Sequence, residues 1–226
     1  MSFEGKTVMI TGAAGNLGRV VADVFSGSKA NLALLDLKGR GDEQGLFIPT
    51  DLRDQKSVDA AAAKAIERFG RIDVLVNIAG GFRMGKPVHE TSDEDWNFLF
   101  DVNVRTVLHT ARAVVPPMLA AGGGRIINIG AFAAQRGAAQ MGAYIASKSA
   151  VIRLTESMAA ELRDKNINVN CVLPTVIDTP PNRSAMPKAD PKRWVAPQDL
   201  AKTIAFLASD DARAIHGAAL PVTGLS

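Results

Sequence analysis

The only tyrosine in this sequence, Tyr144, stands four residues before Lys148. In a helix this spacing puts both side chains on one face, one turn apart. A phenol has a pKa of about 10 and is a poor base near neutral pH, but an adjacent ammonium lowers that pKa. The pair therefore predicts a group that exchanges a proton with a bound molecule. Taken alone, the same spacing fits a surface pair without function equally well.

A glycine-containing turn near the start of the chain is the second candidate site. Residues 11–18 read TGAAGNLG, between a β-branched run and an amphipathic stretch. Such glycines let the backbone approach a pyrophosphate at the positive end of the following helix. The alternative is a turn without a ligand, in which the glycines are needed only because the backbone adopts positive φ angles. The candidate contacts in this turn are Gly12, Gly15, Asn16, Leu17 and Gly18.

A carboxylate, Asp36, ends the next apolar run, eighteen residues after Gly18. At that place it can accept hydrogen bonds from both hydroxyls of an adenosine ribose, so the pattern predicts a site for NAD(H). The same charge repels the 2′-phosphate of NADP(H), although Lys38 and Arg40 lie close enough in sequence to weaken the repulsion. We therefore expect NAD(H) to be preferred, with NADP(H) as the alternative.

Two further segments belong to the predicted cofactor site. Asp51, followed by Leu52, ends the third apolar run, and either bonds the adenine amine or caps the next helix. Residues 77–81 (NIAGG) close the fourth run with small side chains, as backbone that passes close to a cofactor requires. A tight turn without a ligand is the alternative there. From this segment we expect Asn77, Ala79 and Gly80 to contact the cofactor.

Alternating strand and helix patterns position these residues. Apolar runs predict strands at residues 6–11, 31–36, 46–50, 73–78, 125–129, 168–173 and 219–222. Helical patterns cover residues 17–26, 55–69, about 92–121, 143–164 and 197–208, the third with a cap at Ser92 or Thr91, a kink at Pro116 and a stop at Gly122. Strands that are apolar throughout predict a parallel sheet covered on both faces. The predicted fold class is therefore α/β, a single Rossmann-like, doubly wound domain of about seven strands over residues 1–226.

Composition and charge exclude several classes of protein. With 47% hydrophobic and 22% charged residues, the chain is typical of an ordinary globular protein. The 26 basic and 23 acidic residues are interleaved, so the net charge of +3 predicts no nucleic-acid partner. No apolar run is long enough to span a bilayer, and no leader pattern opens the sequence, so we expect no membrane partner and a cytoplasmic location.

Neither the cysteine nor the histidines suggest a reactive or metal site. Cys171 cannot pair internally and is predicted to be a small buried side chain in a strand. His89, His109 and His216 show no ligand spacing, and we expect no catalytic metal.

Taken together, these motifs resemble the short-chain dehydrogenase/reductase family over nearly the whole chain. Residues 11–18 are similar to its TGxxxGxG turn, residues 77–80 to its NNAG strand end, Asn103 to its helix asparagine, and residues 144–148 (YIASK) to its Tyr-x-x-x-Lys pair. The resemblance implies that Tyr144 exchanges a proton with the substrate. It also implies that Lys148 binds the nicotinamide ribose and lowers the tyrosine pKa, and that Asn103 holds a water in a proton relay.

The resemblance further implies cofactor contacts after the sixth strand. There Pro174 and Thr175 stand at the family's Pro-Gly, and Thr179 is expected near the nicotinamide carboxamide or the pyrophosphate. A helix cap or a hydroxyl-stabilised turn explains Thr179 nearly as well. Three positions depart from the family pattern, namely Asn16 at the middle glycine of the turn, Ile78 at the second strand-end asparagine, and Thr175.

A fourth departure is chemical. Ala131 stands where the family's serine orients the substrate carbonyl, and no Ser or Thr occurs between Asn128 and Tyr144. The loss of one donor to a developing oxyanion costs about 2.7 to 4 kcal/mol, or roughly a hundredfold to a thousandfold in rate. An ordinary ketone or alcohol would react slowly unless Gln135 or Gln140 donates instead, whereas an already electrophilic acceptor needs the donor less.

Several segments are similar to dihydropteridine reductase, a branch of this superfamily that uses Tyr and Lys without Ser to reduce a quinonoid pterin with NADH. They comprise residues 35–37, 79–82, 130–131, 141–144 and, above all, 178–194, which contain DTPPNR, MPKAD and Trp194. The last block lies in a loop over residues 175–194, which is too long for a bare connection and is expected to cover the site. Within it, Asn182, Arg183 and Trp194 either contact the substrate or pack the lid onto the domain.

These observations predict an NAD(H)-dependent oxidoreductase that transfers hydride between nicotinamide and a small C=O or C=N substrate. The predicted substrate side comprises Ala131, Gln140, Asn182 and Trp194. Because the family's serine is missing, the alternative is a protein that binds the cofactor as a sensor or assembly partner and has little or no activity. An epimerase or dehydratase has little support, because those relatives have longer chains. The resemblance also implies a homodimer or homotetramer, with residues 150, 151, 154, 158 and 159 either in a helix-on-helix contact or facing their own sheet.

Overall fold

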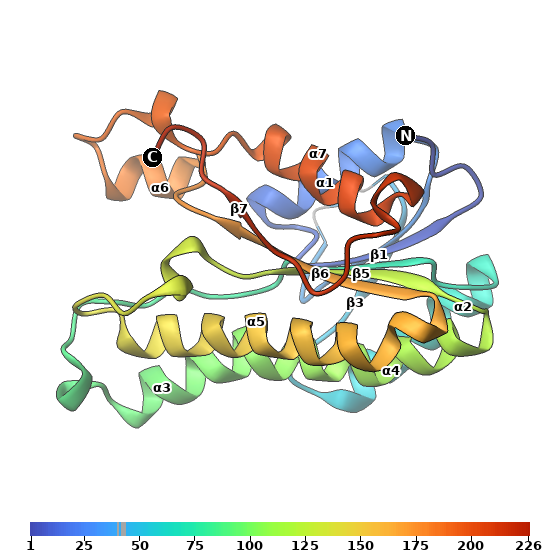
Figure 1. The fold of residues 1–226 in the computed structure, drawn as a ribbon, viewed down its shortest axis with the longest axis horizontal. Helices are drawn as coiled ribbons and strands as arrows, with labels where there is room; N and C mark the ends of the chain where they lie inside the picture. Colours follow the sequence, from blue (N-terminus) through green and yellow to red (C-terminus); the bar gives the residue numbers. More distant parts are fainter. Residues whose placement is uncertain (40, 42–43) are drawn as a thin grey trace.

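One parallel sheet organises the computed structural model, which describes residues 1–39, 41 and 44–226. Its seven strands lie in the order β3-β2-β1-β4-β5-β6-β7 (Figure 1). They are β1 (Thr7–Thr11), β2 (Asn31–Asp36), β3 (Leu46–Pro49), β4 (Val74–Asn77), β5 (Gly124–Ile129), β6 (Ile167–Pro174) and β7 (Ala219–Val222). The strand order reverses between β1 and β4, which opens a crevice at the carboxyl ends of these strands. The predicted α/β doubly wound fold is confirmed.

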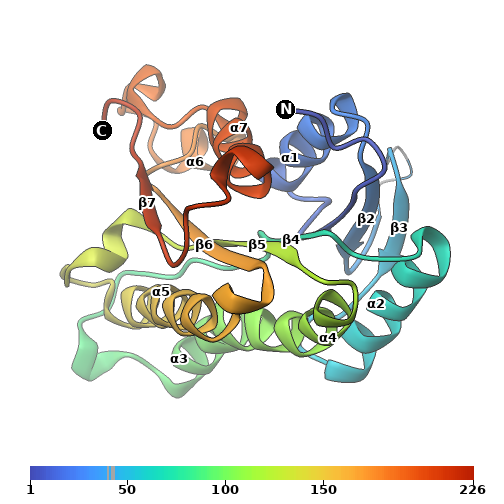
Figure 2. The same ribbon diagram turned by 45° about the vertical axis from the view of Figure 1, so that its right-hand side comes forward.

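Helices cover both faces of the sheet (Figure 2). On one face lie α1 (Asn16–Gly27) and α7 (Pro197–Ala208), and on the other lie α2 (Gln55–Phe69), α4 (Thr106–Ala120) and α5 (Gly142–Leu162). Successive side chains of a strand point to opposite faces, and in β1 this sends Val8 and Ile10 into the core under α1 and α7, and Met9 into the core over α2 and α4. The near-continuous apolar runs of the sequence are therefore explained by burial on both sides.

The long helix predicted over residues 92–121 is built from three pieces. Ser92 caps α3 (Asp93–Phe100) by accepting from the backbone amide of Asp95 at 3.2 Å, as predicted. A π-helical segment, Asp101–Arg105, then joins α3 to α4. Pro116 and Pro117 both lie inside α4, which continues to Ala120, and the kink expected at Pro116 stays a prediction. After α4, Gly122 adopts a φ of 81°, which agrees with the predicted stop.

The loop after β6 has structure of its own. It forms the short helix α6 (Pro180–Ala185), which the sequence patterns did not predict, and a single 3₁₀ turn, Pro191–Arg193. A β-bridge between Ile177 and Val195 closes its base. In Figure 1 and Figure 2, α6 lies on the same side of the sheet as α1 and α7. Among the described residues, no helix is both long enough and apolar enough to cross a lipid bilayer.

Candidate active site

The turn between β1 and α1 presents backbone to the crevice. Gly12 has a φ of 66°, and a Cβ on it would lie 2.9 Å from the backbone nitrogen of Ala79. A Cβ on Gly18 would lie 2.8 Å from Cα of Ala13, so neither position accepts a larger residue. Helix α1 begins after Gly15 with no side-chain cap and no acidic residue in its first turn. This cradle of uncapped amides fits the pyrophosphate of a dinucleotide.

The carboxylate of Asp36 is held beside this turn. Its Oδ2 accepts from the backbone amide of Ala14 at 3.0 Å, and its Oδ1 accepts from the amide of Leu37 at 2.8 Å. The end of β2 and the first turn are therefore locked together, with an acid where the adenosine ribose of a dinucleotide would lie. Lys38 is exposed, and Arg40 lies outside the described residues.

Asp51 is not the helix cap that was one of the two roles predicted for it. The cap of α2 is Asp54, whose side chain accepts from the amide of Lys56 at 3.1 Å, so the helix-cap alternative for Asp51 is wrong. Asp51 instead accepts from Nε and Nη2 of Arg53 at 3.1 and 3.0 Å, and these bonds hold the pKa of its carboxyl below the ordinary value. The neighbouring Leu52 is buried in the core beside α2. Contact of either residue with adenine stays a prediction.

The end of β4 is held by a buried polar network. The carboxamide of Asn77 accepts from Thr110 Oγ1 at 2.9 Å and donates to Asn128 Oδ1 at 2.9 Å. Asn128 in turn donates to Thr155 Oγ1 at 2.9 Å, so the network joins β4 and β5 to α4 and α5. The amides of the two residues after Asn77 donate to Thr11 Oγ1 at 3.0 and 3.2 Å. The side chain of Asn77 is thus a structural group, and the segment offers backbone and small side chains to the crevice.

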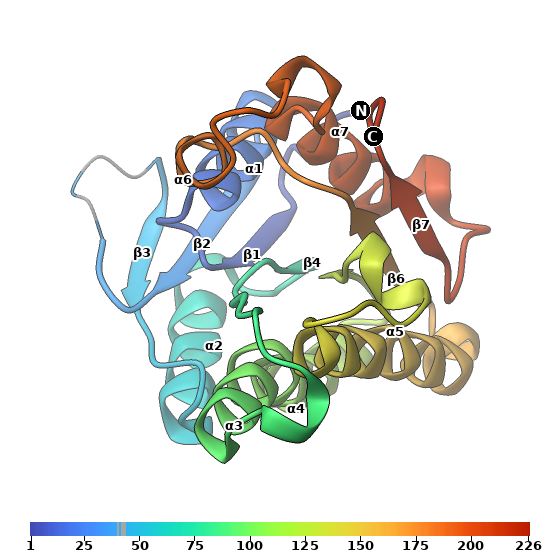
Figure 3. The same cartoon turned by 90° about the vertical axis from the view of Figure 1, so that its left-hand side faces the viewer.

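Tyr144 and Lys148 lie in the first turns of α5, near the carboxyl end of β5. The ring of Tyr144 packs edge to face against Phe82, with 4.8 Å between the ring centroids. Lys148 is only 6% exposed, and its Nζ donates to the carbonyl of Ile129 at 2.8 Å. The start of α5 therefore places the pair at the carboxyl ends of the strands, which are toward the viewer in Figure 3.

Burial dominates the titration of both groups. It raises the pKa of Tyr144 to about 12 and lowers the pKa of Lys148 to about 8. The acidic phenol expected from the neighbouring ammonium is therefore not produced by this protein chain alone. Burial outweighs the ammonium because a desolvated phenolate is costly and a lysine of such low pKa is only partly charged near pH 8.

The π segment brings Asn103 to the same place. Its Oδ1 accepts from the amide of Gly81 at 2.9 Å, while Nδ2 donates to the carbonyl of Gly81 at 3.1 Å and to Ser147 Oγ at 3.0 Å. A Cβ on Gly80 would lie 2.7 Å from Asn103 Oδ1 and 3.3 Å from Lys148 Nζ, so both atoms border Gly80. The π segment re-aims the asparagine side chain, which a regular helix would not do in the same way. The sequence patterns predicted no role for Ser147, although it lies within the motif YIASK, and placed Gly81 only in the small-residue segment 77–81.

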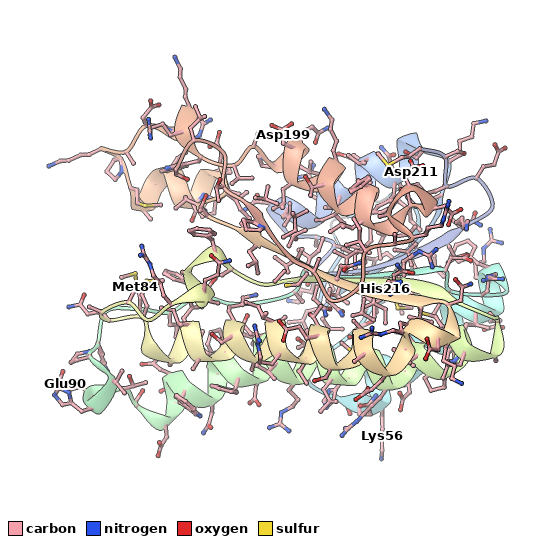
Figure 4. All side chains as sticks on the ribbon, viewed as in Figure 1. Lys56, Met84, Glu90, Asp199, Asp211 and His216 are labelled. Carbon is pink, nitrogen blue, oxygen red and sulfur yellow. The ribbon has the colours of Figure 1, made fainter. Side chains whose placement is uncertain are left out.

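Ala131 leaves the site without a hydroxyl. It is 5% exposed and belongs to a buried apolar cluster against which Tyr144 packs. Gln135 and Gln140 are both exposed, and Gln140 has a φ of 61°. A cavity of about 200 Å³ lies beside the start of α5, and Gln140 lines it together with Arg83, Lys86, Thr91, Asp95 and Ala143. Figure 4 shows Met84, another lining residue, at this end of the molecule.

Most of the predicted lid residues form hydrogen bonds within the lid itself. Thr179 caps α6 by accepting from the amide of Asn182 at 3.4 Å, which is the capping role considered for it. The side chain of Asn182 donates to the carbonyl of Ile177 at 2.8 Å, and Arg183 forms a two-pronged pair with Asp178 at 2.6 and 2.7 Å. These contacts favour a packing role over substrate contact.

The C-terminal segment closes the base of the lid. Trp194 is only 8% exposed, and a Cβ on Gly224 would lie 2.9 Å from its carbonyl oxygen. Thr175, which directly follows Pro174, uses its hydroxyl to donate to the carbonyl of Thr223 at 2.9 Å. The cofactor contacts predicted for Pro174 and Thr175 stay predictions, with the hydroxyl of Thr175 already engaged.

Two remaining predictions concern single groups. Cys171 is fully buried in β6, as expected for a small core side chain, and burial raises the pKa of its thiol to about 11. Within the described part of the chain, no three His, Cys, Asp or Glu side chains are grouped as a metal site would require.

Comparisons with known proteins agree with this geometry. A family model described as Enoyl-(Acyl carrier protein) reductase matches residues 12–224. D-threitol dehydrogenase of Mycolicibacterium smegmatis is 35% identical over 242 residues, which cover 98% of this chain and 93% of that protein.

Solved structures show the same fold. Ligand-free aldohexose dehydrogenase of Thermoplasma acidophilum superposes with a TM-score of 0.90 at 30% identity, covering 99% of this chain and 94% of the other. Carveol dehydrogenase of Mycobacterium avium, in complex with NAD, gives a TM-score of 0.88 at 28% identity, with coverages of 98% and 97%. The chain therefore belongs to the short-chain dehydrogenase/reductase family and is an oxidoreductase.

Proposed function

We propose that this protein is an NAD(H)-dependent reductase or dehydrogenase in which Tyr144 exchanges a proton with a small C=O or C=N substrate. One observation carries the proposal. The buried side chains of Lys148 and Asn103 both border Gly80, in a crevice whose other end is the glycine turn with Asp36. A dinucleotide in this crevice would have Asp36 beside its adenosine ribose and the pair Tyr144 and Lys148 beside its nicotinamide.

Each residue has a distinct task in this proposal. The bound nicotinamide supplies hydride chemistry and, when oxidised, a positive charge. Lys148 binds the nicotinamide ribose through its ammonium, and Asn103 holds the relay that connects this ammonium to solvent. Tyr144, whose pKa burial raises to about 12, then depends on charge brought by the cofactor to reach a useful acidity. The protein is therefore poised for proton transfer only once the cofactor is in place.

The substrate class follows from Ala131. Because Ala131 supplies no hydroxyl, position 131 gives no stabilisation to a developing oxyanion. An acceptor that spreads the new electron pair over a conjugated ring needs that stabilisation less. We therefore favour electrophilic acceptors, and a quinonoid dihydropterin is the example to which the segments similar to dihydropteridine reductase point.

The decisive experiment replaces Tyr144 with phenylalanine. Phenylalanine keeps the ring that packs on Phe82 and removes only the hydroxyl. Turnover should fall at least about a hundredfold while NADH binding persists, because proton transfer contributes roughly that factor. Unchanged turnover would refute the proposal.

A panel of acceptors separates this proposal from a cofactor-binding sensor, which the missing hydroxyl also favours. NADH oxidation is measured with quinonoid dihydropterin, diketones, quinones and simple ketones, using hits from a thermal-shift screen with NADH present. We expect turnover on the conjugated acceptors. Tight NADH binding without turnover on any of them, in both the wild type and Ala131→Ser, would indicate a sensor.

We also propose that the protein assembles as a homodimer or homotetramer. In α5, Val151 and Ala159 face the sheet core, whereas Ala150, Leu154 and Met158 are half-buried. Part of the predicted stripe therefore packs against the protein's own sheet. The remainder supports a helix-on-helix contact, which sedimentation or light scattering of the purified protein would test.

A further inference from the structure

We propose that His109 is a positioning residue for the adenine end of the cofactor site, because its imidazole holds the peptide group that bonds to the Asp51 carboxylate. The proposal rests on the function proposed above and on the predicted contact of Asp51 with the adenine amine. His109 lies in α4 and is only 7% exposed. Its Nδ1 lies 2.9 Å from the carbonyl oxygen of Leu52.

The direction of this hydrogen bond follows from the chemistry of its partners. A carbonyl oxygen can only accept, so Nδ1 of His109 must carry the hydrogen in the neutral as well as in the charged ring. The bond joins α4 to the turn before α2, across 57 positions of the sequence. The imidazole is therefore an interior donor to a segment at the adenine end of the crevice.

One peptide group connects His109 to Asp51. The carbonyl of Leu52 and the amide of Arg53 belong to the same planar trans peptide, so they point in opposite directions. The carbonyl accepts from His109 in the interior, and the amide donates to Oδ1 of Asp51 at 2.9 Å. A tilt of this peptide therefore disturbs both hydrogen bonds, and the carboxylate loses its backbone partner.

Other hydrogen bonds of this turn hold different groups. The amide of Asp51 donates to Ser57 Oγ at 3.0 Å, and its carbonyl accepts from the amide of Asp54 at 3.1 Å, which closes a turn over residues 51–54. The peptide that His109 holds is the central one of this turn, and it can tilt without breaking the closing bond. Among the described residues, no second donor bonds to its carbonyl.

The carboxylate of Asp51 keeps an acceptor position for a ligand. Oδ1 accepts from the amide and Nε of Arg53, whereas Oδ2 accepts only from Nη2, at 3.0 Å, among the described residues. A carboxylate oxygen accepts two hydrogen bonds, so Oδ2 has room for one donor such as the adenine amine. The Arg53 side chain is 56% exposed, and an ion pair at such a surface contributes little. The buried bond from His109 is therefore the firmer anchor.

The backbone of His109 contacts the same region independently of the ring. Its carbonyl accepts from Nε2 of Gln55, the first residue of α2, at 3.1 Å. A substitution at position 109 keeps this carbonyl and removes only the contact of the ring. The central peptide of the turn can thus be perturbed while the start of α2 stays held.

The test compares three substitutions of His109. Leucine in His109→Leu fills the site without a donor. In His109→Asn the amide nitrogen is as many bonds from Cα as Nδ1 of histidine, so it can keep the bond to Leu52, whereas His109→Gln places its amide one bond further away. Val114→Ala is the matched control, because Val114 is fully buried in α4 within the core cluster that includes Leu52. It loosens packing without removing the hydrogen bond.

The readout is the preference of the protein for the adenine amine. Fluorescence titration compares NADH with its hypoxanthine analogue, in which an oxygen replaces that amine. The wild type should bind NADH about tenfold more tightly, since the analogue offers no donor to Asp51. In His109→Leu this ratio should fall to about two, and His109→Gln gives the same reading if the leucine variant does not fold. In His109→Asn and Val114→Ala it should stay within about twofold of the wild type. General loosening weakens both ligands alike and leaves the ratio unchanged.

Different results overturn different claims. A ratio that is unchanged in His109→Leu and His109→Gln overturns the role of His109, and so does a ratio that falls equally in His109→Asn or in Val114→Ala. A wild type that binds NADH without preference for the amine overturns the contact of Asp51 with adenine and this role with it. Absence of NADH binding overturns the proposed function, on which this role depends. Full turnover in Tyr144→Phe overturns only the proposed proton transfer, because the titration needs no turnover.

Discussion

Replacing Ala131 by serine should convert this enzyme into a better catalyst for ordinary ketones. Ala131 is 5% exposed and belongs to the apolar cluster against which Tyr144 packs. A hydroxyl aimed at a developing oxyanion contributes about 2.7 to 4 kcal/mol, which predicts a gain of roughly a hundredfold in kcat/KM for a simple ketone. For a quinonoid acceptor we expect a gain below about threefold, because its new electron pair is already delocalised.

The same substitution should reduce stability. A hydroxyl without a partner in an apolar cluster costs about 1 to 3 kcal/mol, which lowers Tm by a few degrees in a domain of this size. Ala134→Ser is the matched control, since Ala134 is buried in the same cluster. It should show a similar loss of Tm without a gain in turnover. Steady-state NADH oxidation and thermal unfolding of both variants measure the two effects.

A specific pair of results would refute this reasoning. If Ala131→Ser gains no more on ketones than Ala134→Ser, while Tyr144→Phe still abolishes turnover, then position 131 does not contact the reacting carbonyl. The substrate would have to approach Tyr144 from another side, and the preference for electrophilic acceptors would lose its structural basis.

Two further predictions concern single charges. Asp36→Asn keeps an acceptor for the amide of Ala14 and removes the negative charge, so the preference for NAD(H) over NADP(H) should shift about tenfold toward NADP(H), measured as the ratio of kcat/KM values. Burial lowers the pKa of Lys148 from 10.5 to about 8, so the unfolded chain binds more protons between these values and stability should rise with pH from about 8 to 10. Lys148→Met should be more stable than the wild type at pH 7. Its free energy of unfolding, measured in urea, should rise less between about pH 8 and 10. The same pH dependence in both proteins would contradict the buried-lysine assignment.

The sheet and the nucleotide turn were predictable because both depend on local pattern. Continuous apolar runs require burial on both faces, which predicts a parallel sheet, and the six strand pairings observed are all parallel. The glycines at positions 12 and 18 are required by close backbone approach, which glycine alone permits. In these segments, residue type and spacing contain nearly all the physical information.

The parts that were missed depend on partners that are distant in sequence. Asn77 meets Asn128 across the sheet, 51 positions away, and nothing local indicates that its carboxamide is already used. The π segment that aims Asn103 lies in a stretch whose periodicity is that of an ordinary helix. The helix α6 is only six residues long, too short for a periodic signal, and forms because Thr179 caps it and two prolines begin it.

The hydrogen bonds that complete the framework also limit the chemistry of the site. Several buried side chains of α5 and β5 carry hydroxyl or amide groups that are already committed. Ser147 donates to Tyr144, Thr155 donates to Val151, and Asn128 donates to Thr155. None of them can turn toward a substrate oxygen without leaving a buried polar group unpaired, which costs about 1 to 3 kcal/mol. These three groups therefore do not replace the hydroxyl missing at position 131, which supports the proposed preference for substrates that need no oxyanion donor.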